Sequence, residues 1–326
     1  MQFSTKIQIQ PNTFQIEYHS NLLLLGSCFA QNIAQQLDFY KFKSVCNPFG
    51  IIFNPISIQN LLERAINNVE FTENDVFFQN DCWHCYEIHS ELNHPNAMDF
   101  LKNCNQKLLD LKNQVQFANH IVITYGTSWV YQLKETATVV ANCHKMPQQL
   151  FEKKILSIAD IAQSIHKTLE MIRFLNPNCN FIFTISPVRH LKDGFIENQI
   201  SKSHLIAALH QVLFETNNPK NYYFPAFEIL LDELRDYRFY ANDMLHPNEL
   251  AIEYIWNHFV NTCISKSCEK TMQQVYKIQK GLFHKPFNIN SESHQNFLKK
   301  LSSEIKQLQT IYGFIDFEMT SNKKIV

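Results

Sequence analysis

The stretch Leu22-Leu23-Leu24-Leu25-Gly26-Ser27 decides the fold of this chain. Four consecutive leucines indicate a short strand buried on both faces, and the glycine behind them lets the backbone turn sharply. The residues Ile33, Ala34 and Leu37 then recur at helical spacing, so we expect a helix to begin just after Ser27. This pattern predicts an exposed serine hydroxyl at a helix amino terminus, on the carboxyl edge of a sheet.

Further apolar runs have the length of buried strands, and segments with helical periodicity lie between them. The expected strands are residues 121–125, 181–185 and 222–227, and the expected helices are residues 56–66, 98–115, 158–174 and 204–214. Hydrophobicity that is continuous rather than alternating indicates a mostly parallel sheet covered by helices on both faces. The sequence therefore predicts an α/β fold, specifically a three-layer α/β/α sandwich.

Two segments interrupt this alternation and have the pattern of short hairpins. Residues 76–78 pair with 83–88 in the first, and residues 129–133 pair with 136–140 in the second. Insertions at the carboxyl ends of strands are where α/β folds build their sites. We therefore expect both hairpins to border a functional site.

Length and charge indicate two parts. With 326 residues, of which 45% are hydrophobic, we expect a catalytic domain at residues 1–265 and a helical extension at residues 266–326. The extension holds ten basic and five acidic residues, which fits either a solvated helical face or a docking surface for an acidic partner. An apolar stripe at helical spacing predicts a helix that docks on the catalytic domain or on a second copy in a homodimer: Phe297, Leu301, Ile305, Leu308 and Tyr312.

Composition argues against several classes of protein. A net charge of -1 speaks against nucleic-acid binding, which depends on clustered Lys and Arg. No apolar run approaches the roughly 18 residues that span a bilayer, and the amino terminus has no secretory pattern, so we expect no membrane association. Nine scattered cysteines suit reduced thiols, and we expect a cytoplasmic protein without a cofactor.

The segment Asp243-Met244-Leu245-His246-Pro247 supplies an acid and a histidine close enough for one loop to present both. Together with Ser27 they have the order of a Ser-Asp-His triad, in which the carboxylate orients the imidazole and the imidazole deprotonates the serine. The apolar positions that follow predict a helix with Pro247 in its first turn. The alternative is a turn with a capping Asp243 and a surface His246.

At this point the motifs resemble those of a known family. Gly26-Ser27-Cys28-Phe29-Ala30 looks like the signature of the GSCFA family, which is related to the SGNH/GDSL hydrolases. Further stretches similar to that family follow in order: 47–50, Trp83-His84 with His89, 126–131, 142–145, 186–190 and 232–240. The resemblance covers about residues 20 to 260. It implies a three-layer SGNH-like fold with Ser27 as nucleophile, His246 as general base and Asp243 as its partner, and it implies no particular substrate.

The same resemblance implies an oxyanion hole. SGNH hydrolases usually combine the amide of the nucleophile, here Ser27, with a glycine after the second strand, for which Gly50 is suitably placed. The third donor is usually an asparagine after the next strand, where this chain has Gly126-Thr127-Ser128. Either a hydroxyl such as that of Thr127 donates there, or Asn142 of the adjacent hairpin does.

Five side chains are candidates for substrate binding. Arg189 and His190 follow an expected strand and could bind an anionic or sugar-like group, although Arg189 could equally pair with Asp193 or Asp236. Aromatic residues on the expected site loops suit stacking on a sugar ring. The remaining candidates are His84, Trp129 and Tyr240.

Two other chemistries compete with this interpretation. A zinc site from Cys82, His84, Cys85, Cys143 and His144 is conceivable, but a single CxxC without a second spaced pair leads us to expect no metal. Cys28 at the helix amino terminus is an alternative nucleophile, because thiols there can ionise readily.

We therefore expect an esterase that removes a small acyl group, such as acetyl, from a carbohydrate or a similar small molecule. An acyltransferase that uses the same acyl-enzyme, and a binding module without turnover, remain the alternatives.

Overall fold

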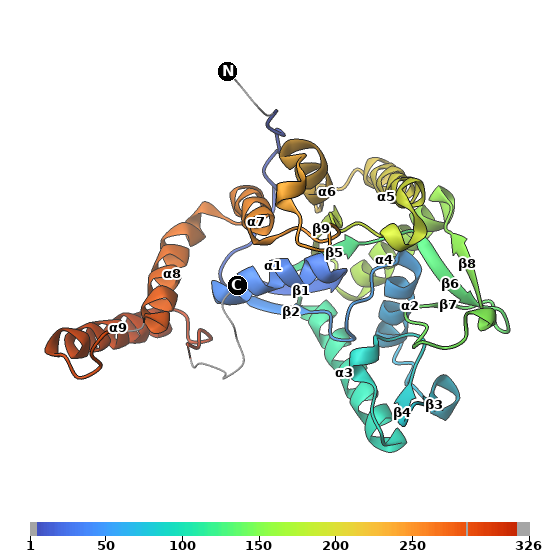
Figure 1. Cartoon of the computed structure of the whole chain (residues 1–326), viewed down its shortest axis with the longest axis horizontal. Coiled ribbons are helices and arrows are strands. Elements are labelled where there is room, and N and C mark those ends of the chain that lie inside the picture. The colour runs from blue at the N-terminus through green and yellow to red at the C-terminus, as the bar shows by residue number, and fades with distance from the viewer. Residues whose placement is uncertain (1–4, 285, 318–326) are drawn as a thin grey trace.

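The computed structural model describes residues 5–284 and 286–317, and its centre is a parallel sheet (Figure 1). The sheet has the strand order β10-β9-β5-β1-β2, and each neighbouring pair is parallel. Its strands are β1 (Asn21–Gly26), β2 (Lys43–Cys46), β5 (His120–Tyr125), β9 (Asn180–Ile185) and β10 (Asn221–Tyr223).

The leucine run of β1 divides the protein into two cores. Leu23 and Leu25 point into one core with side chains of α2 to α5, whereas Leu22 and Leu24 point into the other with side chains of α1 and α6 to α9. Alternate residues of a strand face opposite sides of a sheet, so both faces of this strand are buried. The three-layer α/β/α sandwich is confirmed.

The helices of the first core are α2 (Pro55–Ile66), α3 (Ala97–Phe117), α4 (Ile158–Leu175) and α5 (Phe195–Thr216). Those of the second are α1 (Cys28–Phe39), α6 (Ala226–Glu228), α7 (Glu249–Cys263), α8 (Glu269–Phe283) and α9 (Glu292–Ile311). Single turns connect them: η1 (Glu73–Asp75), η2 (Ser90–Leu92), η3 (Gln148–Leu150), η4 (Leu191–Asp193), η6 (Tyr237–Phe239), η7 (Lys266–Cys268) and the π-helical η5 (Ile229–Leu234). None of the described helices combines the length and the apolar character needed to cross a bilayer.

The two predicted hairpins are present as small antiparallel sheets. β3 (Phe77–Gln79) pairs with β4 (Cys82–His84). β6 (Trp129–Leu133) pairs with β7 (Val139–Val140), and its other edge pairs with β8 (Phe151–Ile155), a strand that the sequence did not predict.

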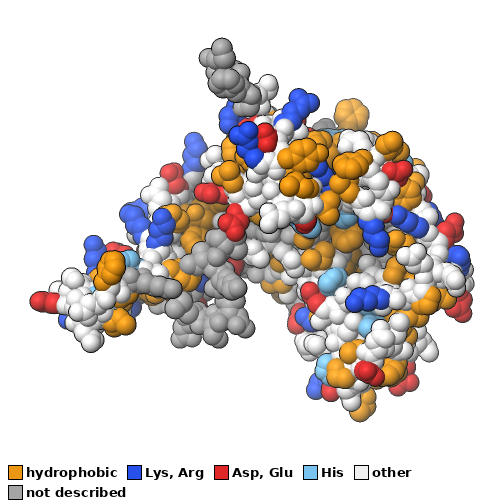
Figure 2. Space-filling view, viewed as in Figure 1, with side chains coloured by type: hydrophobic (Ala, Val, Ile, Leu, Met, Phe, Trp, Pro, Cys, Tyr) orange, Lys and Arg blue, Asp and Glu red, His pale blue; other side chains and the backbone are white. Residues whose placement is uncertain are grey.

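The carboxyl-terminal helices α8 and α9 extend to one side of the main body (Figures 1 and 2). α8 nevertheless belongs to the second core, because Met272, Val275 and Ile278 are buried there. Its Gln279 side chain donates to the carbonyl of Phe39, at the end of α1. Within one chain, the extension therefore packs on the domain, while a homodimer through these helices stays a prediction.

Some expected boundaries are wrong. The run 222–227 is strand only up to Tyr223, and a helical turn begins at Ala226 after Pro225. α7 begins at Glu249 with Asn248 as its cap, so Pro247 precedes the helix rather than occupying its first turn. α5 begins at Phe195, nine residues before the expected start, because exposed apolar residues mask its periodicity.

Gly26→Ala tests the turn that ends β1. Gly26 has φ +131, and a Cβ atom there would lie 2.1 Å from the carbonyl oxygen of Thr124 on the neighbouring strand. We expect the substitution to lower the free energy of unfolding by about 3 kcal/mol or more, because strain and steric overlap add. Denaturant unfolding measures this. Gly313→Ala is the control, because the nearest atom to a Cβ there is 4.0 Å away. An equally small effect of both substitutions would contradict the requirement for glycine at position 26.

Candidate functional site

Ser27 lies where the sequence placed it, between β1 and α1. It is the N-cap of α1, and its Oγ accepts a hydrogen bond from the amide of Phe29 at 3.2 Å. The prediction of an exposed hydroxyl is wrong, however, because Ser27 exposes only 2% of its surface. The residue therefore offers little exposed surface to a substrate.

The side chains of Asp243 and His246 contact each other within one turn, at the distance of an ion pair. One carboxylate oxygen of Asp243 lies 2.6 Å from Nδ1 of His246, and the other accepts the amides of Leu245 and His246 at 2.9 and 3.0 Å. These amides and the imidazole lower the pKa of Asp243 to about 2, so the carboxylate is ionised at neutral pH. An ionised acceptor requires the proton on Nδ1, which leaves Nε2 of His246 as the basic nitrogen.

The loop of Asp243 and His246 is bonded to the carboxyl edge of the sheet. The amide of Arg189, four residues past the end of β9, donates to the carbonyl of Leu245 at 3.1 Å. Ser27 lies at the same edge, because β1, β5 and β9 are parallel neighbours. Among the described residues no hydrogen bond joins the Ser27 hydroxyl to His246, so the complete triad stays a prediction.

Cys28, the alternative nucleophile, is the first residue of α1. Burial raises the pKa of its thiol, although backbone amides act in the opposite direction. A thiol with a raised pKa carries less of the reactive thiolate at neutral pH. This environment favours Ser27 over Cys28 as the nucleophile.

Two backbone amides that were predicted to bind the oxyanion already donate hydrogen bonds to backbone carbonyls. The amide of Ser27 donates to the carbonyl of Thr124 at 3.1 Å, which continues the ladder between β1 and β5. The amide of Gly50 donates to the carbonyl of Asn47 at 2.8 Å and closes the turn after β2. Either amide can serve an oxyanion only by sharing or exchanging this bond.

The predicted third donors also have internal partners. The hydroxyl of Thr127 lies 2.8 Å from that of Ser201 and accepts the amide of Trp129. The side-chain oxygen of Asn142 accepts the amide of His144 at 2.8 Å. Their roles at an oxyanion stay predictions.

Asn47 is a donor that the sequence analysis missed. Its side-chain oxygen accepts the amide of Gly26 at 2.8 Å, directly before Ser27. Its side-chain nitrogen is buried and has no hydrogen-bond partner among the described residues. An unpaired buried N–H is costly, so such a group is a candidate to meet a ligand.

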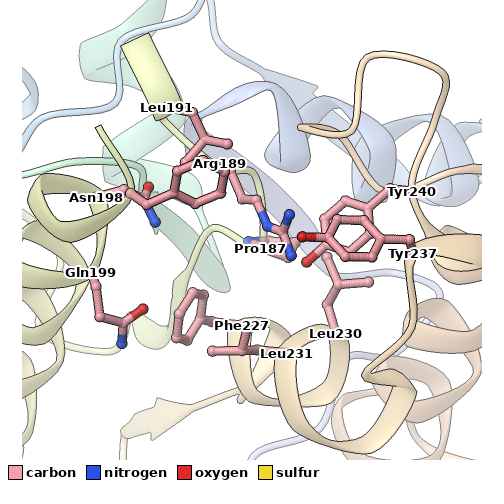
Figure 3. A pocket seen from close by; sticks show the side chains of 11 residues that line it. Pro187, Arg189, Leu191, Asn198, Gln199, Phe227, Leu230, Leu231, Tyr237 and Tyr240 are labelled. Atoms are coloured by element: carbon pink, nitrogen blue, oxygen red, sulfur yellow. The ribbon is translucent and has the colours of Figure 1, made fainter. Parts of the chain in front are cut away.

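Arg189 and Tyr240 line a cavity of about 170 Å³ between α5, α6, η5 and the loop after β9 (Figure 3). The guanidinium of Arg189 stacks on the ring of Tyr240 at 4.0 Å and on that of Tyr237 at 5.1 Å. The other lining residues are Pro187, Leu191, Phe195, Asn198, Gln199, Phe227, Leu230 and Leu231.

The remaining predicted binding residues do not line this cavity. His84 is buried in the first hairpin, with its Nδ1 3.2 Å from Nδ1 of His144. Trp129 donates its indole N–H to the carbonyl of Glu197. His190 packs against Phe53. A role of His84, Trp129 and His190 in substrate binding stays a prediction.

No three His, Cys, Asp or Glu side chains come together as a possible metal site in the described part of the chain. The nine cysteines are free thiols. His84 and His144 do meet, but their Nε2 atoms face the carbonyls of Gln79 and Cys85, as is usual for packed histidines.

Lys202 of α5 is a second residue that the sequence analysis missed. It exposes 1% of its surface, and its Nζ donates to the carbonyls of Gly126 and Ser186 at 2.6 and 2.7 Å. These two carbonyls follow the last residues of β5 and β9, so Lys202 joins the strand ends beside Ser27. The sequence did indicate its burial, because Lys202 lies on the same helical face as the buried Ser201, Leu205 and Leu209.

Burial disfavours the charged form of two bases at this edge. It lowers the pKa of Lys202 to about 7 and, with help from Lys202 and His246, the pKa of His190 to about 3. Nε2 of His190 is buried without a partner among the described residues and faces Gly126. The sheet edge is therefore a region of low polarity, in which an added charge is expensive.

The fold and these residues define an α/β/α protein that has a buried serine and an acid–histidine loop at the carboxyl edge of its sheet. The chain belongs to the GSCFA family: the family model matches residues 21–259, and the model of the C-terminal domain of GSCFA domain proteins matches residues 275–322. Among curated proteins, none matches the chain in sequence.

Among solved structures, the chain is similar to an acetyl xylan esterase from the rumen bacterium Butyrivibrio proteoclasticus, with 12% sequence identity and a TM-score of 0.41. The similarity covers 76% of this chain and 65% of the esterase, so the chain spans less than two thirds of that protein.

Lys202→Met tests the buried lysine through the pH dependence of stability. The unfolded chain binds this proton up to about pH 10.4 and the folded protein only up to about pH 7. Between these values the free energy of unfolding should rise with pH by about 1.4 kcal/mol per unit, and the variant should lack this rise.

The measurement is denaturant unfolding of both proteins from pH 7.5 to 9.5. The contributions of all other titrating groups cancel in the difference between the two curves of unfolding free energy against pH. Parallel curves would therefore contradict the lowered pKa of Lys202.

Proposed function

We propose that this protein is a serine ester hydrolase of the SGNH type, which removes a small acyl group such as acetyl from a carbohydrate or a similar small molecule. The observation that carries the proposal is the pair of Asp243 and His246, in which an ionised carboxylate lies 2.6 Å from the imidazole. The pair lies on a loop bonded to the sheet edge at which Ser27 caps α1.

In this mechanism Oγ of Ser27 attacks the ester carbonyl carbon and its proton passes to Nε2 of His246. The tetrahedral intermediate collapses, the alcohol leaves with that proton, and an acyl-enzyme on Ser27 remains. Water then repeats the sequence and releases the acid. Asp243 stays ionised throughout and stabilises the imidazolium, which matches its low pKa.

Two features of Ser27 support its role. As the N-cap of the twelve-residue helix α1, its oxygen is at the positive end of the helix dipole, which favours developing negative charge. The bond that its Oγ accepts comes from the amide of Phe29, and it leaves the hydroxyl proton free to move to a base.

Ser27→Ala should lower kcat for a short-chain nitrophenyl ester by at least about 10³-fold, because both half-reactions need the hydroxyl. It should also abolish labelling by a fluorophosphonate probe, read by mass spectrometry of the peptide that contains residue 27. Full activity in this variant would remove the mechanism.

Two controls separate chemistry from structure in that experiment. Cys28→Ala should keep activity and labelling, whereas loss of both there would make the thiol the nucleophile. Ser157→Ala removes the N-cap of α4, including its bond to the amide of Asp160, and so matches the structural part of Ser27→Ala. It should cost about 1 kcal/mol of stability and leave kcat unchanged.

For the oxyanion we propose the side-chain N–H of Asn47. Asn47→Asp keeps an oxygen for the amide of Gly26 and replaces the donor by an acceptor. We expect kcat to fall by about 10² to 10³-fold in steady-state kinetics, the usual effect of losing one such donor. Asn176→Asp is the matched control, since Asn176 is also buried but bonds Val115 and Ala118. An unchanged kcat in Asn47→Asp would assign the oxyanion to other groups.

A further inference from the structure

The charge of Arg189 is not used inside the described structure. The two carboxylates expected to pair with it have other partners: Asp193 binds Lys153, and Asp236 binds Arg238 at 3.1 Å. No salt bridge of the described residues involves Arg189. A half-buried guanidinium without a counter-ion is available to an anionic ligand.

Two tyrosines fix the orientation of this guanidinium. Figure 3 shows Arg189 pointing toward the rings of Tyr237 and Tyr240, while Asn198 and Gln199 lie on the other side of the cavity. The rings of Tyr240 and Tyr237 lie 4.0 and 5.1 Å from the guanidinium carbon, and the Tyr240 hydroxyl also accepts a hydrogen bond from this group. A guanidinium has five N–H donors, so the others remain available to a carboxylate.

Apart from Asn198 and Gln199, the remainder of the cavity is apolar, and its volume fits a ring. Phe195, Phe227, Leu230 and Leu231 contribute its walls, and hydrophobic side chains gather on the surface over α5 and α6 (Figure 2). The volume of about 170 Å³ is close to the roughly 150 Å³ of a cavity that holds benzene. A bare inorganic anion would bind the guanidinium and leave these walls unused.

Residues at the cavity are bonded through their backbone to the loop of His246. Arg189 donates its amide to Leu245, Tyr240 pairs with Pro247, and the amide of Ala241 donates to the carbonyl of His246 at 2.8 Å. His246 is the group that hands its proton to the departing alcohol in the proposed mechanism. The cavity is therefore next to the loop that carries His246.

We propose that this cavity binds the alcohol portion of the substrate, and that this portion is a ring-sized body carrying a carboxylate that Arg189 binds. The inference rests on the proposed function, and it narrows the substrate class to acyl esters of small hydroxy acids. The ring packs between Phe227 and the leucines of η5, and the carboxylate binds the N–H groups of Arg189 that Tyr240 leaves free.

The first experiment compares two esters of equal shape, 4-acetoxybenzoate and 4-acetoxybenzamide, which differ in the charge of one group. The wild type should hydrolyse the carboxylate with a kcat/KM at least about tenfold higher, because a charge-assisted bidentate bond is lost with the amide. Arg189→Met should remove this preference. Equal kcat/KM values in the wild type, or an unchanged preference in the variant, would overturn the proposal.

Arg173→Met is the matched control. Arg173, in the last turn of α4, also lies over an aromatic ring, that of Phe181 at 5.4 Å. This ring is near the amino end of β9, at the opposite end of the strand from the site edge. The variant should keep the preference for the carboxylate. A loss equal to that of Arg189→Met would show a general effect of removing positive charge and would overturn the assignment.

The second experiment separates the cavity from catalysis. Calorimetry measures the binding of 4-hydroxybenzoate to the Ser27→Ala protein, in which no turnover is expected, and to the double variant with Arg189→Met. Binding that weakens by at least about tenfold in the double variant supports the cavity. Absence of binding overturns the cavity proposal alone, whereas full hydrolysis by Ser27→Ala overturns the proposed function alone.

Discussion

The close approach of β1 to β5 at Gly26 is the constraint on which the site depends. A Cβ atom at this residue would lie 2.1 Å from the carbonyl of Thr124, and φ +131 is a conformation that side chains disfavour. Only glycine lets the chain leave the sheet at this point and enter α1 two residues later. The position of Ser27, and with it the direction of its hydroxyl, follows from this one turn.

At the same edge of the sheet, burial disfavours charged side chains, except on the loop of Asp243. Burial lowers the pKa of Lys202 to about 7 and that of His190 to about 3, whereas Asp243 lies on a half-exposed turn and is ionised. A carboxylate in partial contact with water keeps its charge at little cost in free energy, and the imidazole beside it gains from that charge. One sheet edge therefore combines the fixed anion of Asp243 with a buried amine whose protonation changes near pH 7.

Much of the fold, and less of the site, could be predicted from the sequence. The leucine run predicted β1 because both faces of this strand are buried. β2 was not predicted, because it is short and Val45 is exposed.

The sequence could place Lys202 on a buried helical face, but its contacts depend on two carbonyls distant in the chain. Asp243 was predicted to be either a turn former or a triad member. One of its oxygens accepts turn amides and the other lies beside the imidazole, so the turn does not exclude the triad role.

Arg189 shows why the choice between a structural and a binding role needed coordinates. From the sequence, a binding role and an ion pair with Asp193 or Asp236 had equal weight, and nothing local could tell that Lys153 and Arg238 pair with these carboxylates. An arginine whose side chain contacts aromatic rings and one hydroxyl keeps most of its five N–H donors for a ligand. Two tyrosines therefore hold the cation in place without neutralising it, which suits the proposed role in binding an anion.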